Sequence, residues 1–441
     1  MNGLPMRLDR LVPAISLALV VAACDGDTVS DPAPEPSLDA RLRASITPFG
    51  VIPIAPLLPR DPALVSLGRD LFFDPILSGN RDVSCASCHD PRTHTTDRRA
   101  LSVGTGGAGR APTPRNAAAL LNAGLGFSLF WDGRLGEEGF GRYRTPFGAA
   151  LPSGLDHVLA AQAMFPVTNR TEMRGLPGDR DVHGAPNELA AIADADVAAI
   201  WSAVMRRLLA VPAYAERFRA AYPAVPAAQL GFQHAANALA AFQLQAFTKT
   251  DSPFDRYLAR RDDALTVEQK QGALLFFGQA RCATCHSGPL LGVTQFTSIG
   301  APQVGPGMGR LAPLDGGRED LFVNQQPRFF FRVPALRNVE LTAPYTHAGA
   351  YATLEAVVRH YDDVEAAIAT YDVSQLDPAL RASYHGDAAT RSALLASVDP
   401  RVRQPLRLSA EQQRQLVAFL KSLTDPAARE LPAAGSPLPA R

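Results

Sequence analysis

Two copies of one short motif constrain this chain more than any other feature of its sequence. The pattern C-x-x-C-H occupies residues 85–89 and again residues 282–286. In such a motif the two thiols add across the two vinyl groups of a haem, and the histidine supplies an axial nitrogen to the iron. The six residues with these expected roles are Cys85, Cys88, His89, Cys282, Cys285 and His286. The motifs therefore predict two covalently attached c-type haems.

Zinc binding and dithiol redox chemistry are the competing interpretations of these cysteines. Structural zinc sites usually combine C-x-x-C pairs that lie close together, whereas these pairs are about 200 residues apart and each is followed directly by histidine. A thioredoxin-like dithiol would need a βαβ context, which the sequence does not indicate. Both alternatives are weaker than haem attachment.

The N-terminus has the pattern of an export signal. Arg7 and Arg10 precede an apolar run over residues 11–23, which predicts a signal peptide spanning residues 1–23. The run ends in "VAAC", which resembles a bacterial lipobox and predicts a lipid on Cys24; a plain secretory signal is the alternative. Residues 24–55 are polar and Pro-rich at their start and are expected to form a flexible tether. We therefore expect a periplasmic protein anchored to a membrane.

The number of cysteines and the overall charge bear on disulfide bonds and on the kind of partner. The chain has five cysteines, so with Cys24 lipidated and four in the motifs none remains for a disulfide. Its 43 Lys and Arg balance its 43 Asp and Glu, which gives no indication of a nucleic-acid partner. A homodimer is compatible with the sequence.

The surroundings of the two motifs form an internal repeat. "GRDLFF" (68–73) precedes the first motif and "GALLFF" (272–277) precedes the second, each at the end of an expected amphipathic helix. Asp61 and Thr266 are the expected N-caps of these helices, and Ser409 begins a third helix, to about Leu423, that could close the second haem pocket. The sequence predicts a mainly α protein with few strands and two cytochrome-c-like domains, over 56–255 and 256–430, followed by a tail over 431–441.

Three further segments carry a family resemblance. They are "PRNAAALLNAGLGFSLFWDGR" (114–134), "QAMFPVTNRTEM" (162–173) and "FRVPALRNVELTAPYTHAG" (331–349). In this order around the two motifs they resemble the bacterial di-haem cytochrome c peroxidase and MauG superfamily, from about residue 60 to residue 425. The resemblance implies two helical domains whose haems face a shared interface, with a calcium ion at that interface and hydrogen peroxide as substrate.

The resemblance also implies roles for individual residues. Glu172 matches the family's glutamate above the first haem, where a carboxylate moves a proton between the two oxygens of peroxide, and Gln162 matches its companion glutamine. Trp131 matches the tryptophan between the haems, which divides one long electron transfer into two shorter ones. The implied calcium ligands are Asn116 through its side chain and Thr342 and Pro344 through their carbonyl oxygens. For Glu172 and Trp131, a solvated loop residue and core packing are the alternative interpretations.

The first haem site departs from the family pattern at Thr105. Many family members place a second histidine on the open face of this haem, in a segment like S-x-G-H; here the segment is "SVGTGG" (102–107). Threonine is a poor ligand for haem iron, so we expect this haem to be open to peroxide at rest. His94 is the alternative ligand.

The second haem site departs at Tyr361. Other members place a methionine on its far side, but the residue that matches is Tyr361, and Met308 is the only methionine after the second motif. Leu354, Val357, Val358 and Tyr361 recur with helical spacing, which places the tyrosine on an inward face. MauG-type members use tyrosine at the equivalent place, and a phenolate lowers the haem potential where methionine raises it. His360 is the rival ligand, and an ordinary core tyrosine is the other alternative.

Other residues receive less definite expectations. His347 matches a family histidine near the second haem without an assigned catalytic role, and Arg332 and Arg337 are either partners of haem propionates or surface arginines. Two stretches, about 135–161 and about 365–406, are expected to be insertions.

These expectations lead to three functional hypotheses. In the first, the protein reduces hydrogen peroxide to water with electrons from a small c-type cytochrome or copper protein. In the second, which Thr105 and Tyr361 favour, a MauG-like di-haem oxidase uses peroxide to oxidise a protein or organic substrate. The third, a non-catalytic electron carrier, is disfavoured by Glu172 and Gln162 in their motif.

Overall fold

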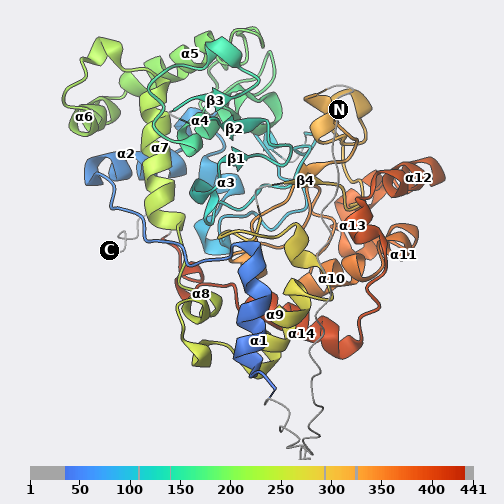
Figure 1. The fold of residues 1–441 in the computed structure, drawn as a ribbon. Helices are drawn as coiled ribbons and strands as arrows, with labels where there is room; N and C mark the ends of the chain where they lie inside the picture. Colours follow the sequence, from blue (N-terminus) through green and yellow to red (C-terminus); the bar gives the residue numbers. More distant parts are fainter. Residues whose placement is uncertain (1–34, 108–109, 140, 293–294, 323–325, 433–441) are drawn as a thin grey trace, which may run out of the picture. The chain divides into compact units, whose positions relative to one another are not determined.

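The computed structural model of the chain describes residues 35–432, except 108–109, 140, 293–294 and 323–325. The predicted signal peptide, the predicted lipid site at Cys24 and nearly all of the predicted tail lie outside this part. The described part is mainly helical with short strands, as the sequence predicts (Figure 1).

The helices and strands follow one another along the chain with long connecting segments. The helices are α1 (Leu38–Ile46), α2 (Pro62–Phe73), α3 (Cys85–Cys88), α4 (Val158–Ala163), α5 (Val197–Leu209), α6 (Pro212–Ala221), α7 (Phe232–Phe247), α8 (Pro253–Leu258), α9 (Val267–Phe277), α10 (Leu354–Asp362), α11 (Val364–Ala369), α12 (Ala388–Ser397), α13 (Pro400–Arg403) and α14 (Ala410–Lys421). The strands are β1 (Ser128–Leu129), β2 (Leu135–Glu137), β3 (Tyr143–Arg144), β4 (Phe296–Thr297) and β5 (Phe331–Arg332). They form two antiparallel sheets, β1–β2–β3 and β4–β5.

Two main hydrophobic cores divide the apolar side chains between the halves of the chain. The first contains side chains from Val65 to Phe247, and the second contains side chains from Leu42 to Val51 and from Phe254 to Leu423. The change from one core to the other therefore falls between residues 247 and 254, although the contacts join residues from Leu38 onward into one compact unit.

The helix starts that the sequence predicts are confirmed. Asp61 accepts hydrogen bonds from the amides of Ala63 and Leu64 in α2, and Pro62 occupies the first position of this helix. Thr266 with Gln269 caps α9, and Ser409 with Gln412 caps α14, each as a reciprocal capping box. These caps satisfy amide groups that would otherwise have no partner within the helix.

The repeated G-x-x-L-F-F sequence marks equivalent helix crossings in the two cores. A Cβ atom on Gly68 of α2 would lie 1.8 Å from the carbonyl oxygen of Ala238 in α7. A Cβ atom on Gly272 of α9 would likewise lie 1.8 Å from the carbonyl oxygen of Gln415 in α14. Both glycines therefore allow two helix backbones to approach each other more closely than any side chain would permit.

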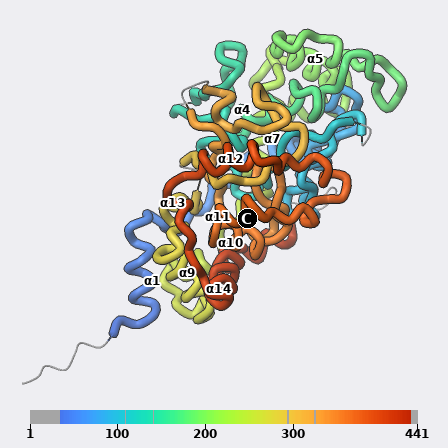
Figure 2. Tube along the Cα trace, turned by 90° about the vertical axis from the view of Figure 1, so that its right-hand side faces the viewer, coloured from blue at the N-terminus to red at the C-terminus, as the bar shows by residue number. Residues whose placement is uncertain are grey.

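The predicted tether extends too far toward the C-terminus. Residues 38–46 form α1, and Leu42 and Ile46 are buried in the second core. Figures 1 and 2 both show α1 beside α9, which it contacts. Leu38, Leu42 and Ile46 recur every four residues, a helical period that the polar composition of the preceding residues conceals.

Within the described residues, no single helix is both long and apolar enough to cross a membrane. The pair α5 and α6 has the required length and composition together, but the two helices are bent by 104° at their junction.

Substitution of Gly272 tests the close crossing of α9 and α14. We expect Gly272→Ala to lower the free energy of unfolding of the holoprotein by about 1–3 kcal/mol, because the new methyl group must push the helices apart. Denaturant unfolding measures this change. Glu268→Gln, at an exposed position of the same helix, is the matched control and should stay within about 0.5 kcal/mol; an equal loss in both variants would contradict the crossing.

Candidate functional site

Trp131 lies in the turn of a short hairpin. Strands β1 and β2 pair through Leu129 and Leu135, and residues 130–134, "FWDGR", connect them. The indole Nε1 of Trp131 donates a hydrogen bond to the carbonyl oxygen of Asn116 at 2.9 Å, and the amide of Arg332 donates to the carbonyl oxygen of Trp131 at 2.7 Å. Part of the stretch expected as an insertion (135–161) is therefore the return strand that holds this turn.

A buried arginine fixes the same turn. Arg115 donates from Nη1 to Asp132 at 2.5 Å and from Nε and Nη2 to the two oxygens of Asp315 at 2.6 and 2.8 Å. None of these side chains is more than 7% exposed. Burial opposes all three charges, but their mutual attraction prevails: it raises the pKa of Arg115 and lowers the pKa of both carboxyls.

Glu172 lies in a π-helical turn, Arg170–Arg174. Such turns are rare and frequently occur at functional sites. Asn169 Nδ2 donates to Glu172 Oε1 at 2.8 Å, and the amide of Thr105 donates to the carbonyl oxygen of Glu172 at 2.9 Å. Burial raises the pKa of Glu172, while the positive charges of Arg134 and Arg115 oppose that rise. The result is a half-buried carboxyl that holds a proton more readily than an exposed glutamate.

The segment "SVGTGG" packs directly against this turn. A Cβ atom on Gly104 would lie 1.9 Å from the carbonyl oxygen of Thr171, so only glycine fits there. The hydroxyl of Thr105 donates to Asp82 Oδ1 at 2.6 Å, and the amide of Gly106 donates to Asp82 Oδ2 at 2.7 Å. Thr105 therefore lies next to Glu172, with its hydroxyl held by Asp82.

His94, the alternative ligand at the first site, has different neighbours. Burial lowers its pKa, and the charged groups that act on it are Arg98, Arg429 and Glu340. None of these is among the groups that act on Glu172. The Nδ1 atom of His94 is buried and has no hydrogen-bond partner among the described residues, so His94 stays an alternative prediction for the first site.

The first C-x-x-C-H motif forms helix α3 and the residue that ends it. His89 Nδ1 lies 3.3 Å from the carbonyl oxygen of Thr95. Burial raises the pKa of Cys88 to about 12, and the carboxylates of Asp97 and Glu172 add to that rise. The Glu172 carboxylate is therefore close enough to this motif for its charge to act on Cys88.

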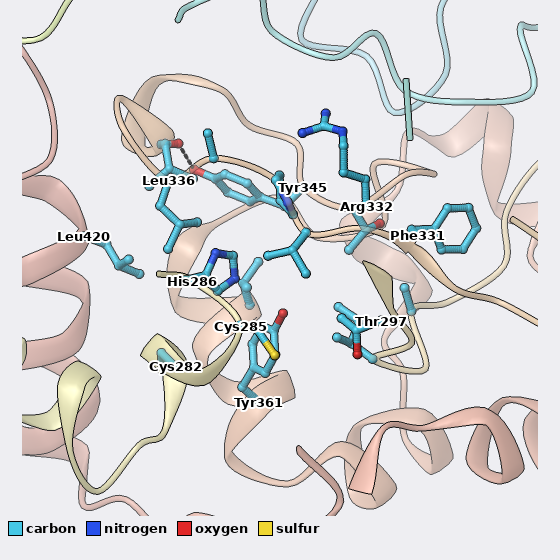
Figure 3. A pocket seen from close by; sticks show the side chains of 18 of the residues that line it. Cys282, Cys285, His286, Thr297, Phe331, Arg332, Leu336, Tyr345, Tyr361 and Leu420 are labelled. Carbon is cyan, nitrogen blue, oxygen red and sulfur yellow. Dashed lines mark hydrogen bonds between the residues drawn. The ribbon is translucent and has the colours of Figure 1, made fainter. Parts of the chain in front are cut away.

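The second motif lies in an apolar cavity of about 280 Å³. Figure 3 shows Cys282, Cys285, His286 and Tyr361 around this cavity. Trp131 also lines it, so the hairpin of the first half reaches the second motif. Leu416 and Leu420 of α14 line it as well, which confirms that this helix closes the pocket.

Helix α10 turns one face toward the cavity. The four residues that the sequence places on this inward face all line it: Leu354, Val357, Val358 and Tyr361. Burial raises the pKa of Tyr361, and the two cysteines of the motif act on it electrostatically. His360 points elsewhere: its Nδ1 lies 2.7 Å from the hydroxyl of Tyr351 and its Nε2 lies 2.7 Å from the carbonyl oxygen of Ile299. Of the two rivals, only Tyr361 faces the cavity.

The three residues implied as calcium ligands line the same cavity, near Trp131. Asn116 donates from its side chain to the carbonyl oxygens of Arg99 and Ala100 at 2.9 and 3.3 Å. In the described part of the chain, no three His, Cys, Asp or Glu side chains cluster as metal ligands would. A calcium site thus depends on Asn116, Thr342 and Pro344, and it stays a prediction.

His347, Arg332 and Arg337 also line the cavity, and neither arginine is a surface residue. His347 stacks on Phe331 with ring centroids 3.8 Å apart, and burial lowers its pKa to about 4. Arg332 Nε donates to the carbonyl oxygen of Phe130 at 3.0 Å. Arg337 forms a buried ion pair with Asp255, while its Nη2 has no hydrogen-bond partner among the described residues.

These features fit two c-type haems. A carbonyl oxygen only accepts, so the contact of His286 Nδ1 with the carbonyl oxygen of Leu291 at 3.0 Å requires a proton on Nδ1 and leaves Nε2 for iron. His89 makes the same type of contact with Thr95. The four motif cysteines are free thiols. The unpartnered Nη2 of Arg337 is a suitable donor to a haem propionate.

The sequence missed several of these residues. Arg115 and Asp315 are 200 positions apart, and nothing local signals their pairing. Asn169 was detectable, since an asparagine three residues before Glu172 is a typical N-cap, and it accepts from the amide of Thr171. Gln162 lies in the last turn of α4, and among the described residues the hydrogen bond to the Glu172 side chain comes from Asn169 rather than from Gln162.

A mainly helical chain with two such motifs defines the class of di-haem c-type cytochromes. Residues 62–263 match the family described as di-haem cytochrome c peroxidase. The methylamine utilization protein MauG of Methylorubrum extorquens is 30% identical over 418 residues, which cover 94% of each chain. Cytochrome c551 peroxidase of Pseudomonas aeruginosa is 32% identical over 292 residues, or 64% of this chain and 67% of that protein.

Solved structures agree with these relatives. The crystal structure of a MauG-like protein associated with microbial copper homeostasis is 27% identical, covers 86% of this chain and 95% of its own, and gives a TM-score of 0.57. The diheme peroxidase BthA from Burkholderia thailandensis has the same fold, with a TM-score of 0.59 at 22% identity over 89% of this chain and 93% of its own.

The chain belongs to the di-haem cytochrome c peroxidase and MauG family. Membership implies two c-type haems and an oxidoreductase that reduces peroxide with electrons from a redox partner, with MauG-like oxidation as the alternative use of the same site.

Removal of Arg115 tests the buried ion network. We expect Arg115→Met to lower the free energy of unfolding by about 3–5 kcal/mol, because Asp132 and Asp315 would stay buried without a counter-charge. Arg92→Met is the control, since the Arg92 side chain of the Arg92–Asp90 pair is 77% exposed and its loss should leave the free energy of unfolding nearly unchanged. Denaturant unfolding of both holoproteins gives the comparison, and equal losses would show that the buried network contributes nothing special.

Proposed function

We propose that this protein is a periplasmic di-haem peroxidase whose two haems have different tasks. One haem would be held by Cys85, Cys88 and His89 and would meet hydrogen peroxide. The other, held by residues 282–286, exchanges electrons with a small c-type cytochrome or copper protein. The observation that carries this division is the half-buried carboxyl of Glu172, in a π-helical turn that packs against the 102–107 segment and lies close to the first motif.

At the first site, haem iron supplies a binding position for peroxide and the electrons that split it. Glu172 takes a proton from one oxygen of peroxide and delivers it to the other, which leaves as water. Asn169 holds Glu172 Oε1, and the 104–106 loop fixes the backbone of the turn, so the carboxyl keeps one orientation. With Thr105 in place of the family's histidine, the open face needs no ligand to be displaced before peroxide enters.

Between the sites, Trp131 carries the electron. Its indole ring lines the cavity of the second motif and belongs to the hairpin that Arg115 and Arg332 hold in place. A ring fixed in this manner loses little energy to reorganisation when its charge changes. Asn116, Thr342 and Pro344 border the same region and would hold a calcium ion through oxygen atoms, as that cation prefers.

At the second site, Tyr361 favours a second candidate function. A phenolate ligand stabilises ferric iron and lowers the potential of the haem, which suits the storage of oxidising equivalents for a protein or organic substrate. Peroxide-dependent turnover with reduced small cytochrome c distinguishes the peroxidase from this MauG-like oxidase.

The two C-x-x-C-H motifs and the N-terminal segment support placement outside the cytoplasm. A signal peptide over residues 1–23 would export the chain, and a lipid on Cys24 would anchor it to a membrane facing the periplasm. The predicted tether would end before α1, which begins at Leu38. The two haem domains would extend over 56–255 and 256–430.

Substitution of Glu172 tests the proposed acid–base role. We expect Glu172→Gln to slow the reaction with peroxide by about 10²- to 10⁴-fold, because an amide cannot accept the proton. Since burial raises the Glu172 pKa, the wild-type rate should fall on acidification at a higher pH than an ordinary glutamate would give, and the variant should lack this step. Stopped-flow absorption across pH measures both.

Glu216→Gln, at an exposed position of α6, is the matched control and should behave as wild type. A Glu172→Gln variant with an unchanged rate and pH profile would remove Glu172 from the mechanism.

A further inference from the structure

A continuous series of aromatic rings leads away from the second-motif cavity. Tyr361 lines the cavity, and its ring centroid lies 5.8 Å from that of His360. The His360 ring lies 5.2 Å from Tyr351, Tyr351 lies 5.6 Å from Tyr371, and Tyr371 lies 5.0 Å from Tyr384. Each of these distances is within the range of direct ring contact.

The series passes from the interior to solvent. Tyr351 is 4% exposed, whereas Tyr371 and Tyr384 are only half-buried. The two outer rings pack against a small apolar cluster that includes Leu376 and Val304, and Tyr384 also pairs with Val304 through a backbone bridge. Tyr371 and Tyr384 both belong to the stretch 365–406, which the sequence indicates as an insertion.

Tyr351 has a proton acceptor within hydrogen-bond distance. The carbonyl oxygen of Ile299 can only accept, so His360 Nε2 carries the proton at that 2.7 Å contact. His360 Nδ1 is then the unprotonated nitrogen, and the hydroxyl of Tyr351 donates to it at 2.7 Å. A phenol loses an electron far more easily when its proton can move along an existing hydrogen bond. Tyr371 lacks this arrangement, since its hydroxyl donates to the carbonyl oxygen of Ala350.

We propose that Tyr351, Tyr371 and Tyr384 form an electron path between the second haem and the surface of the 365–406 stretch. The inference rests on the proposed electron-exchanging role of that haem. One electron leaves Tyr351 toward the haem, and its phenolic proton moves to His360 Nδ1, which leaves a neutral tyrosyl radical. An electron from Tyr384 then passes across the Tyr371 ring to the Tyr351 radical, and Tyr351 regains its proton from His360. The proton that Tyr384 loses passes to water.

The known reaction supplies the oxidant for this path. Reduction of one hydrogen peroxide to two waters consumes two electrons and two protons, so two passages along the path balance one turnover. An external donor gives its electron to Tyr384, which regains a proton from water. The 365–406 stretch would therefore be the surface at which electrons enter.

Radical trapping in the holoprotein tests the path. We expect one equivalent of peroxide, added without an electron donor, to give a tyrosyl radical signal in electron paramagnetic resonance. A nitroso spin trap should then form an adduct on Tyr384, located by peptide mass spectrometry. Tyr351→Phe should abolish both the signal and the adduct. Tyr371→Leu should abolish the adduct but keep the radical signal, since it removes only the joining ring.

Tyr222→Phe is the matched control. Tyr222 also contacts a histidine ring, with centroids 4.8 Å apart to His234, but it packs against the first core and donates to the His234 carbonyl oxygen. This variant should retain the signal and the adduct. The variant at the half-buried Tyr371 keeps the test decisive if Tyr351→Phe does not fold.

The outcomes separate this inference from the proposed function. Suppose that haem absorption changes with peroxide but the Tyr384 adduct still forms in Tyr351→Phe or Tyr371→Leu. That result would overturn the electron path and leave the proposed function standing. Absence of any adduct on Tyr384 despite that absorption change would do the same. Haem absorption that does not respond to peroxide would overturn the proposed function itself.

Discussion

The buried ion pairs of Arg115 are the interaction on which the site depends. One guanidinium joins Asp132, next to Trp131, to Asp315, which lies 200 residues from Arg115 in the other half of the chain. Charges buried this deeply are costly unless each one is paired, so the three side chains tolerate only one arrangement. That arrangement fixes the hairpin turn of Trp131 to the segment that carries Asp315, and the amide of Arg332 in β5 holds the same turn. The path between the two proposed haems is therefore held by electrostatics in a dry interior, which solvent ions screen very little.

The two C-x-x-C-H motifs share a way of holding haem and differ in what surrounds it. Each histidine has its Nδ1 at a backbone carbonyl, which leaves Nε2 for iron. The charge of a half-buried carboxyl, Glu172, acts on the first motif, whereas a tyrosine, Tyr361, lines the cavity of the second. A carboxyl suits proton transfer to and from peroxide, and a phenol suits control of the potential. The repeated motif can thus serve two different tasks, because Glu172 and Tyr361 come from different segments of the chain that do not repeat.

Local signals made much of the fold predictable. Caps at Asp61, Thr266 and Ser409 fixed three helix starts, and helical spacing placed Tyr361 on the inward face of α10. The motif order also indicated the family. What could not be predicted depends on partners far apart in sequence: the pairing of Arg115 with Asp315, and the rings that continue from His360 into the 365–406 stretch. Helix α1 was missed for a different reason, since its short apolar period follows a Pro-rich segment that reads as a tether.

The central claim is that the two haems differ at rest, one open and one closed. Electron paramagnetic resonance of the resting diferric protein, before and after one equivalent of peroxide, measures this most directly. We expect a high-spin signal from the open haem and a separate signal from the haem that Tyr361 faces. The high-spin signal should disappear when peroxide is added. Two low-spin signals that do not respond to peroxide would contradict it.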